Sequence, residues 1–275
     1  MRRWSNGYDN GLPRAKIRDP LGLCLRKDSH LSGFEMRYFT KLPADAFFQN
    51  INKTLIFLNK YMKKPEKVLV ICAHNDDQIV GVGGTLAKYS KQGKNINTLI
   101  FSYGELSHPH LKPKVIIKTR VTESHKSDRI IGGAGVYYLG LKEGKFLANK
   151  NKVKSKIKAV IKQKKPSKIF THSRDDPHPD HRAVFKIVNE LINETKNHFD
   201  VYSFGVWNLI TLRKRNVPKL VVDITDTFNK KVKAFQVHKS QKAAVIPLMW
   251  KIYLKDMMNG WNNGVKYAEV FHKIK

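Results

Sequence analysis

The chain has 275 residues, 41% of them hydrophobic, and its 52 Lys and Arg against 22 Asp and Glu give a formal net charge of +30. This apolar content excludes a chain that is disordered throughout, and the length fits one α/β domain with extensions. The apolar run 68–73 is far shorter than the ~20 residues of a membrane span. No apolar segment follows the basic N-terminus, and two cysteines make no disulfide framework, so we expect a cytoplasmic protein without a transmembrane segment.

The positive charge attracts nucleic acid, anionic lipid or anionic substrates. The lysines, however, are spread along helix-forming stretches such as 152–158, and no RNP-type or zinc-finger pattern accompanies them. We therefore interpret most of the charge as a solvated surface, and charge alone identifies no partner.

The first 44 residues show no clear period and predict an N-terminal extension, so the domain is expected to span 45–275. A helical pattern at 45–61 ends at Pro65, and strand and helix patterns then alternate. Strands are predicted at 67–73, 97–102, 136–139, 168–172 and 220–224, and helices at 83–92, 115–131, 153–161, 183–191 and 228–237. The amphipathic, aromatic-rich region 240–275 has no clear assignment; it is a candidate cap on the sheet or a subunit contact in a homo-oligomer.

Alternating strand and helix units with continuous apolar strands predict a Rossmann-like α/β domain, with a mostly parallel sheet and helices on both faces. In such sheets, ligands bind in the crevice beyond the carboxyl ends of the strands.

Two polar clusters are predicted to lie at this edge. His74, Asp76 and Asp77 follow the strand at 67–73, and the segment THSRDDPHPDH at 171–181 follows the strand at 168–172. The same rule of topology therefore brings together two His and Asp clusters that are far apart in sequence.

A nucleotide-binding loop is not what the glycines after the first cluster encode. Gly81 and Gly83 fit the start of G-x-G-x-x-G, but residue 86 is Leu, and no Gly-Lys-Ser/Thr of a P-loop is present. We interpret these glycines as allowing the following helix to pack tightly on the sheet.

A metal site fits the two clusters. His74 and Asp77, three residues apart across a strand-to-helix turn, can face one point, and a third ligand from the second cluster would leave one position for water, as in catalytic zinc sites. Nitrogen and oxygen ligands suit zinc but leave iron, cobalt and manganese open. Asp76 is then placed to take a proton from that water. Of His178 and His181, one would be a ligand and the other would stabilise an oxyanion; the spacing does not decide which.

Taken singly, each cluster has a structural interpretation. An Asp-Asp pair is usually a helix N-cap or a solvated turn, and Asp175–Asp176 before Pro177 is typical of such a turn. His-Pro-Asp-His is also common at a capped helix start. Both clusters together at strand ends favour a functional site.

These residues resemble the LmbE/PIG-L-like zinc-dependent N-deacetylases. The first motif of that family, A-H-P-D-D-E, corresponds to AHNDDQ at 73–78, and its second motif, H-P-D-H, is intact at 178–181. RVTES at 120–124, LGLKEG at 139–144 and HKSQ at 238–241 agree with it. The resemblance covers about 66–245 and is nearest in type to deacetylases of N-acetylglucosamine units, including chitobiose-type enzymes.

The resemblance implies a role for each matched residue. His74, Asp77 and His181 would bind zinc, and Asp76 would be the general base. His178, in its protonated form, would stabilise the tetrahedral oxyanion.

Outside the two motifs, the resemblance implies that Arg120 and Glu143 contact the substrate. The alternative for Arg120 is an exposed helix residue paired with Glu123, and for Glu143 a solvated loop carboxylate. The roles of His238 and Gln241 stay open, with core packing as an alternative.

Two positions depart from the family pattern. Asn75 replaces a proline that stiffens the turn, which predicts looser ligand geometry. Gln78 replaces an acid, which removes a charge near the metal. Neither change removes a ligand or the base.

The sequence thus predicts a zinc-dependent hydrolase that removes the N-acetyl group from an N-acetylglucosamine-containing substrate. The alternative is a catalytically altered family member that binds nucleic acid or anionic lipid.

Overall fold

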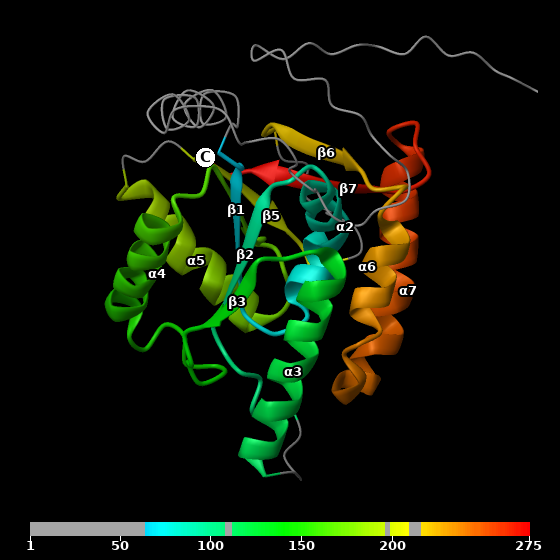
Figure 1. Ribbon diagram of the computed structural model, residues 1–275. Helices are drawn as coiled ribbons and strands as arrows, with labels where there is room; N and C mark the ends of the chain where they lie inside the picture. Colours follow the sequence, from blue (N-terminus) through cyan, green and yellow to red (C-terminus); the bar gives the residue numbers. More distant parts are fainter. Residues whose placement is uncertain (1–63, 108–111, 196–198, 209–215) are drawn as a thin grey trace, which may run out of the picture. The chain divides into compact units, whose positions relative to one another are not determined.

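The computed structural model describes residues 64–107, 112–195, 199–208 and 216–275, which form an α/β fold (Figure 1). The predicted extension 1–44 and the helix predicted at 45–61 lie outside these residues. In the described part of the chain one sheet is formed by the strands β1 (Lys67–Cys72), β2 (Asn95–Ile100), β3 (Gly135–Tyr138), β4 (Lys168–His172), β5 (Asp200–Phe204), β6 (Lys219–Asp223) and β7 (Ala268–Lys273).

The order of the strands is β3-β2-β1-β4-β5-β7-β6. β1 pairs in parallel with β2 and with β4, and β3 and β5 continue the parallel pairing on the two sides. β7 is antiparallel to both of its neighbours. The predicted Rossmann-like, mostly parallel sheet is therefore confirmed.

Helices cover both faces of the sheet, as predicted. α4 (Lys150–Lys164) and α5 (Pro179–Asn193) lie on one face, and α2 (Asp77–Lys91), α3 (Pro113–Ile131), α6 (Phe228–Phe235) and α7 (Lys242–Trp261) on the other (Figure 1). A short 3-10 helix, η1 (Lys239–Gln241), precedes α7. No helix in the described part of the chain is long and apolar enough to cross a bilayer.

The central strand β1 explains why two hydrophobic cores form. Val68, Val70 and Cys72 point into the core beneath α2 and α6, whereas Leu69 and Ile71 point into the core beneath α4 and α5. Successive side chains of a strand alternate between faces, so a continuous apolar run is what a strand covered on both faces requires.

The prediction that α2 begins at residue 83 was wrong, because the helix begins at Asp77. Glycines are poor helix formers, and those of α2 hid its first turns. Their packing role is confirmed: a Cβ at Gly81 would overlap the ring of Phe204, and one at Gly84 would overlap Ile224. The glycines let the helix approach the sheet.

The strands β5 and β7 and the helix α7 were not predicted. β5 (DVYSF) is short and partly polar, and β7 is antiparallel and outside the alternating pattern. α7 carries apolar residues on its exposed as well as its buried face, which obscures the helical period.

A buried ion cluster ties α6 to α7 and β7. The Nζ atom of Lys231 lies 2.6 Å from Oδ2 of Asp256 and 2.7 Å from Oε1 of Glu269, and all three side chains are buried. Glu269 also accepts hydrogen bonds from the N–H groups of Gly84 and Thr85 on α2. The cluster therefore joins four elements on one face of the sheet.

We expect Lys231→Met to lower the free energy of unfolding by about 3–5 kcal/mol, because it leaves two buried carboxylates without their cation. Urea denaturation would measure the change. Lys233→Met, on the exposed face of the same helix, is the matched control. Equal stability of the two variants would contradict a stabilising role for the cluster.

Candidate active site

The two polar clusters meet where the strand order reverses. The chain proceeds from β1 to β2 and β3 on one side and from β4 to β5 on the other, so the carboxyl ends of β1 and β4 border the crevice at this switch point. The turn between β1 and α2 carries His74 and leads into Asp77, the first residue of α2, and the loop between β4 and α5 carries Asp176 and His178. The structure thus brings together the two clusters, as the sequence predicted.

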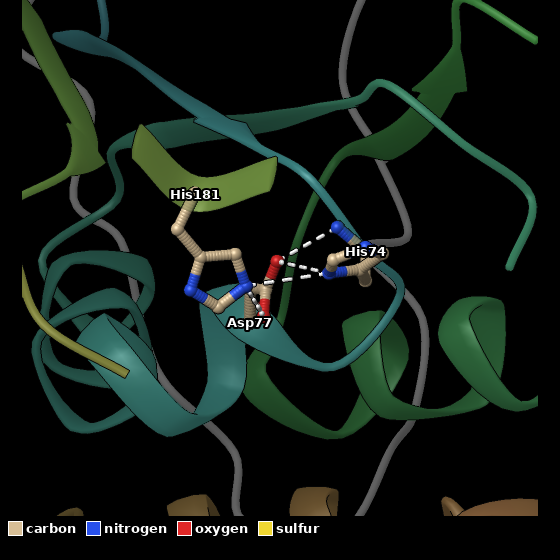
Figure 2. Close-up of side chains that lie close together, drawn as sticks. All are labelled: His74, Asp77 and His181. Carbon is tan, nitrogen blue, oxygen red and sulfur yellow. Dashed lines mark hydrogen bonds and ion pairs between the residues drawn. The ribbon is translucent and has the colours of Figure 1, made fainter. Parts of the chain in front are cut away.

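Three of the predicted residues converge on one point (Figure 2). Nδ1 of His74 lies 3.3 Å from Nε2 of His181. The carboxylate of Asp77 lies 3.4 Å from His74 Nδ1 through Oδ2 and 3.2 Å from His181 Nε2 through Oδ1. One ligand atom from each residue lies within 4.8 Å of the other two, a group able to hold one metal ion.

Two further carboxylates orient the imidazoles. Asp176 Oδ1 accepts a hydrogen bond from Nδ1 of His181 at 2.9 Å, which leaves the lone pair of Nε2 facing Asp77. Asp180 Oδ2 lies 3.3 Å from Nε2 of His74, which leaves the lone pair of Nδ1 facing Asp77 and His181. Metal-binding histidines commonly bond a carboxylate through the second nitrogen in this way. The donor set therefore fits a divalent metal that prefers nitrogen and oxygen ligands.

The electrostatics of the group also favour a cation. Burial lowers the pKa of His74, but Asp77, Asp180 and Glu143 outweigh it and raise the pKa to about 10. Burial likewise opposes protonation of His181, and Asp77 with Asp176 raises its pKa to about 9. The field at these nitrogens therefore stabilises positive charge, which a metal ion supplies in place of protons.

Asp76 lies beside the metal group but is not part of it. It precedes α2 as the N-cap residue, is almost fully buried, and its Oδ1 lies 3.5 Å from the guanidinium of Arg120. Its carboxylate lines the same pocket as His74 and Asp77. A carboxylate in this lining, outside the group of possible ligands, is a candidate proton acceptor.

The structure removes one interpretation of Arg120. Its side chain is buried, donates to the carbonyl of Gly104 and lies 4.0 Å from Oε1 of Glu143, so the exposed alternative was wrong. Glu123 is bonded instead to the N–H and the hydroxyl of Ser240.

Glu143 is not a solvated loop carboxylate either. Its Oε2 accepts the N–H of Leu106, and its side chain lines the pocket together with Arg120. Gln241 also lines this pocket, whereas His238 is buried next to it. Arg120 and Glu143, the two residues that the family resemblance named for substrate contact, therefore both lie at the pocket.

His178 is the N-cap of α5, and its Nδ1 accepts a hydrogen bond from the N–H of Asp180. Burial, together with the neighbouring rings of His181 and His74, lowers its pKa. A neutral ring with Nε2 as its N–H donor is therefore favoured over the protonated form that the family resemblance implied.

The turn is held despite its departures from the family pattern. The side chain of Asn75 donates to the carbonyl of Tyr103, and that of Gln78 donates to the carbonyl of Asn75. Both side chains are fully buried. These bonds hold the turn by a means other than proline.

A pocket of about 290 Å³ lies beside the possible metal ligands. It is lined by His74, Asp76, Asp77, Leu106, Ser107, Arg120, Glu143, His178, Asp180, Val206, Trp207, Gln241 and Leu248. Ligand pockets start at about this size, which suits a small ligand or one unit of a larger one.

Sequence reasoning missed three residues of the site. Asp176, interpreted as part of a solvated turn, is fully buried and also accepts the N–H groups of Val206 and Trp207. Asp180 was given no role, and His172 stacks on His181 with 4.0 Å between ring centroids while its Nε2 accepts the N–H of Ala73. The alternation of Asp and His from 176 to 181 was the available signal for the two carboxylates.

With this geometry established, comparisons with known proteins identify the fold. The family model described as "PIG-L: GlcNAc-PI de-N-acetylase" matches residues 69–192, which contain both clusters. The diacetylchitobiose deacetylase of Thermococcus kodakarensis is 24% identical over 242 residues, covering 82% of this chain and 89% of that protein.

Two solved structures share the fold. The N,N'-diacetylchitobiose deacetylase from Pyrococcus horikoshii, complexed with its inhibitor MPG, aligns with a TM-score of 0.66 at 23% identity, covering 86% of this chain and 94% of that chain. GalB, the 4-carboxy-2-hydroxymuconate hydratase from Pseudomonas putida KT2440, aligns with a TM-score of 0.65 at 20% identity, covering 76% and 96%. Because a hydratase and a deacetylase fit equally well, the fold by itself does not select the reaction.

We expect Asp176→Asn to weaken metal binding about 10- to 100-fold, because the orienting carboxylate behind His181 is lost. Isothermal titration calorimetry with Zn²⁺ would measure this affinity. Asp175→Asn removes the same charge one residue away, from a carboxylate that lies 3.5 Å from Arg174 Nε, and is the matched control. Equal affinity of the two variants would contradict the orienting role.

Proposed function

We propose that the chain is a zinc-dependent N-deacetylase of the PIG-L family, which the match of residues 69–192 to that family's model supports. In this proposal it hydrolyses the N-acetyl group of an N-acetylglucosamine-containing substrate and releases acetate and a free amine. The observation that carries the proposal is the convergence of His74, Asp77 and His181 beside the carboxylate of Asp76.

The donor set supports zinc as the metal, since two imidazole nitrogens and a carboxylate with no thiolate are a known ligand set for catalytic zinc. When bound, zinc would supply a Lewis acid that polarises the amide carbonyl and lowers the pKa of water at the site. The orienting bonds from Asp176 and Asp180 hold the two imidazoles in the tautomer that this binding needs.

The remaining residues handle protons and substrate. Asp76 accepts a proton from the attacking water and returns it to the amide nitrogen as the C–N bond breaks, a role that its place in the pocket lining supports. His178, neutral with Nε2–H free of the bond that Nδ1 makes, donates to the carbonyl oxygen as negative charge develops on it. Arg120 and Glu143, which both line the pocket and lie 4.0 Å apart, bind the hydroxyl groups of the sugar.

The test is acetate release by the zinc-loaded protein from N-acetylglucosamine, N,N'-diacetylchitobiose and N-acetylglucosaminyl-inositol. Release from at least one of these, lost on metal removal and restored by Zn²⁺, is the expected result. No release from any of them, with one zinc bound per chain, would contradict the assignment to N-acetylglucosamine substrates.

We expect Asp76→Asn to lower kcat by about 10²- to 10⁴-fold, the usual contribution of a general base, with zinc still bound because Asp76 is not a ligand. Acetate release and metal content, measured on the same samples, separate the two effects. Wild-type turnover in the variant would rule out the proposed base, and loss of zinc would place Asp76 among the ligands.

A further inference from the structure

The outer face of α7 is apolar from Ile246 to Trp261. Trp261, Trp250 and Ile246 are 85%, 68% and 66% exposed. Other exposed apolar side chains continue the same stripe at helical spacing: Tyr253, Leu254, Met257 and Met258. We call these seven residues the α7 stripe. Exposed apolar groups scattered singly are ordinary, but a contiguous stripe with two tryptophans indicates a binding surface.

The charged side chains in the described part of α7 point inward, the reverse of an ordinary surface helix. Among the α7 side chains that the structure describes, the charged ones face the protein: Lys251, Lys255 and Asp256. Lys251 and Lys255 both donate to the carbonyl of Gly205, and Asp256 binds Lys231. The charged groups anchor the helix from within, so the apolar stripe is left as its outer surface.

A cationic side chain borders the stripe at the C-terminal end of α7, where Lys266 shares a surface hollow with Trp261 and Met257. Lys230, on the helix α6 that packs against α7, is also exposed. An apolar strip rich in Trp, Tyr and Met on a strongly cationic chain is complementary to an anionic lipid surface, where the rings enter the interface and the ammonium groups meet the headgroups.

We propose that α7 is a docking helix, which binds the protein to anionic membranes through the α7 stripe. The net charge of +30 supplies the long-range attraction, and burial of the stripe supplies the short-range affinity. The pocket lies on the inner side of the same helix, where the buried side chain of Leu248 lines it.

A second copy of the chain fits this face less well. The stripe holds seven residues, whereas stable interfaces use roughly 20–30 residues on each side. Two chains of this charge also repel each other, while an anionic bilayer attracts each of them.

The experiment is co-sedimentation of the full chain with vesicles of phosphatidylcholine alone and of phosphatidylcholine with phosphatidylglycerol, at low and high salt. Binding to the anionic vesicles, weakened by salt, is expected. Trp250→Ser/Trp261→Ser should bind at least about tenfold more weakly, because two interfacial anchors are lost. Val115→Ser/Leu147→Ser, which removes exposed apolar groups from other elements, is the matched control and should bind as the wild type does.

Three results would overturn the proposal. One is no binding to the anionic vesicles. Another is equal binding by the tryptophan variant and the control, which would place the contact elsewhere. The third is a wild-type oligomer in size-exclusion chromatography with light scattering that the tryptophan variant converts to a monomer, which would make the stripe an interface between copies. Since the stripe lies outside the pocket lining, acetate release from soluble substrates should be the same in all variants, and this readout keeps the two proposals separate.

Discussion

Negative charge concentrated at the carboxyl ends of β1 and β4 is the constraint on which the rest of the site depends. Asp77, Asp176 and Asp180 lie within hydrogen-bond or ion-pair distance of two imidazoles, and all three carboxylates are buried. Such an arrangement is stable only when positive charge lies among the carboxylates. Protons on His74 and His181 satisfy it in part, which explains why the pKa values of both rings are raised. A divalent cation would neutralise the carboxylates more fully than protons do. Because Asp176 and Asp180 each contact one nitrogen of an imidazole, the lone pair of the other nitrogen is left facing the point where the cation would bind.

The fold makes this concentration of charge possible. Because β1 and β4 are neighbours and the chain leaves them in opposite directions, two loops far apart in sequence meet without any other contact being required. Each loop then enters a helix, with Asp77 in the first turn of α2 and Asp180 in the first turn of α5. The positive end of a helix dipole favours a carboxylate at that position, so local helix chemistry supports the same anionic centre.

The parts of this arrangement that the sequence predicted are those carried by strong periodicity and by adjacent polar residues. Apolar strands followed by His and Asp predicted the parallel sheet, the edge of the site and the convergence of His74 and Asp77 with a histidine of the second cluster. The family resemblance then selected His181 over His178. Asp176 was missed because its neighbours, Asp175 and Pro177, are typical of a solvated turn, and only the tertiary structure shows that four N–H groups surround its carboxylate. α7 was missed for a related reason, since its apolar residues lie on two faces and its lysines bond inward.

The central claim is that His74, Asp77 and His181 together hold one divalent metal. A crystal structure of the zinc-loaded protein, with anomalous diffraction recorded on both sides of the zinc edge, tests it most directly. One anomalous peak is expected within about 2.0–2.2 Å of His74 Nδ1, His181 Nε2 and a carboxylate oxygen of Asp77. A peak at other residues, or no peak at this group in zinc-loaded crystals, would contradict it.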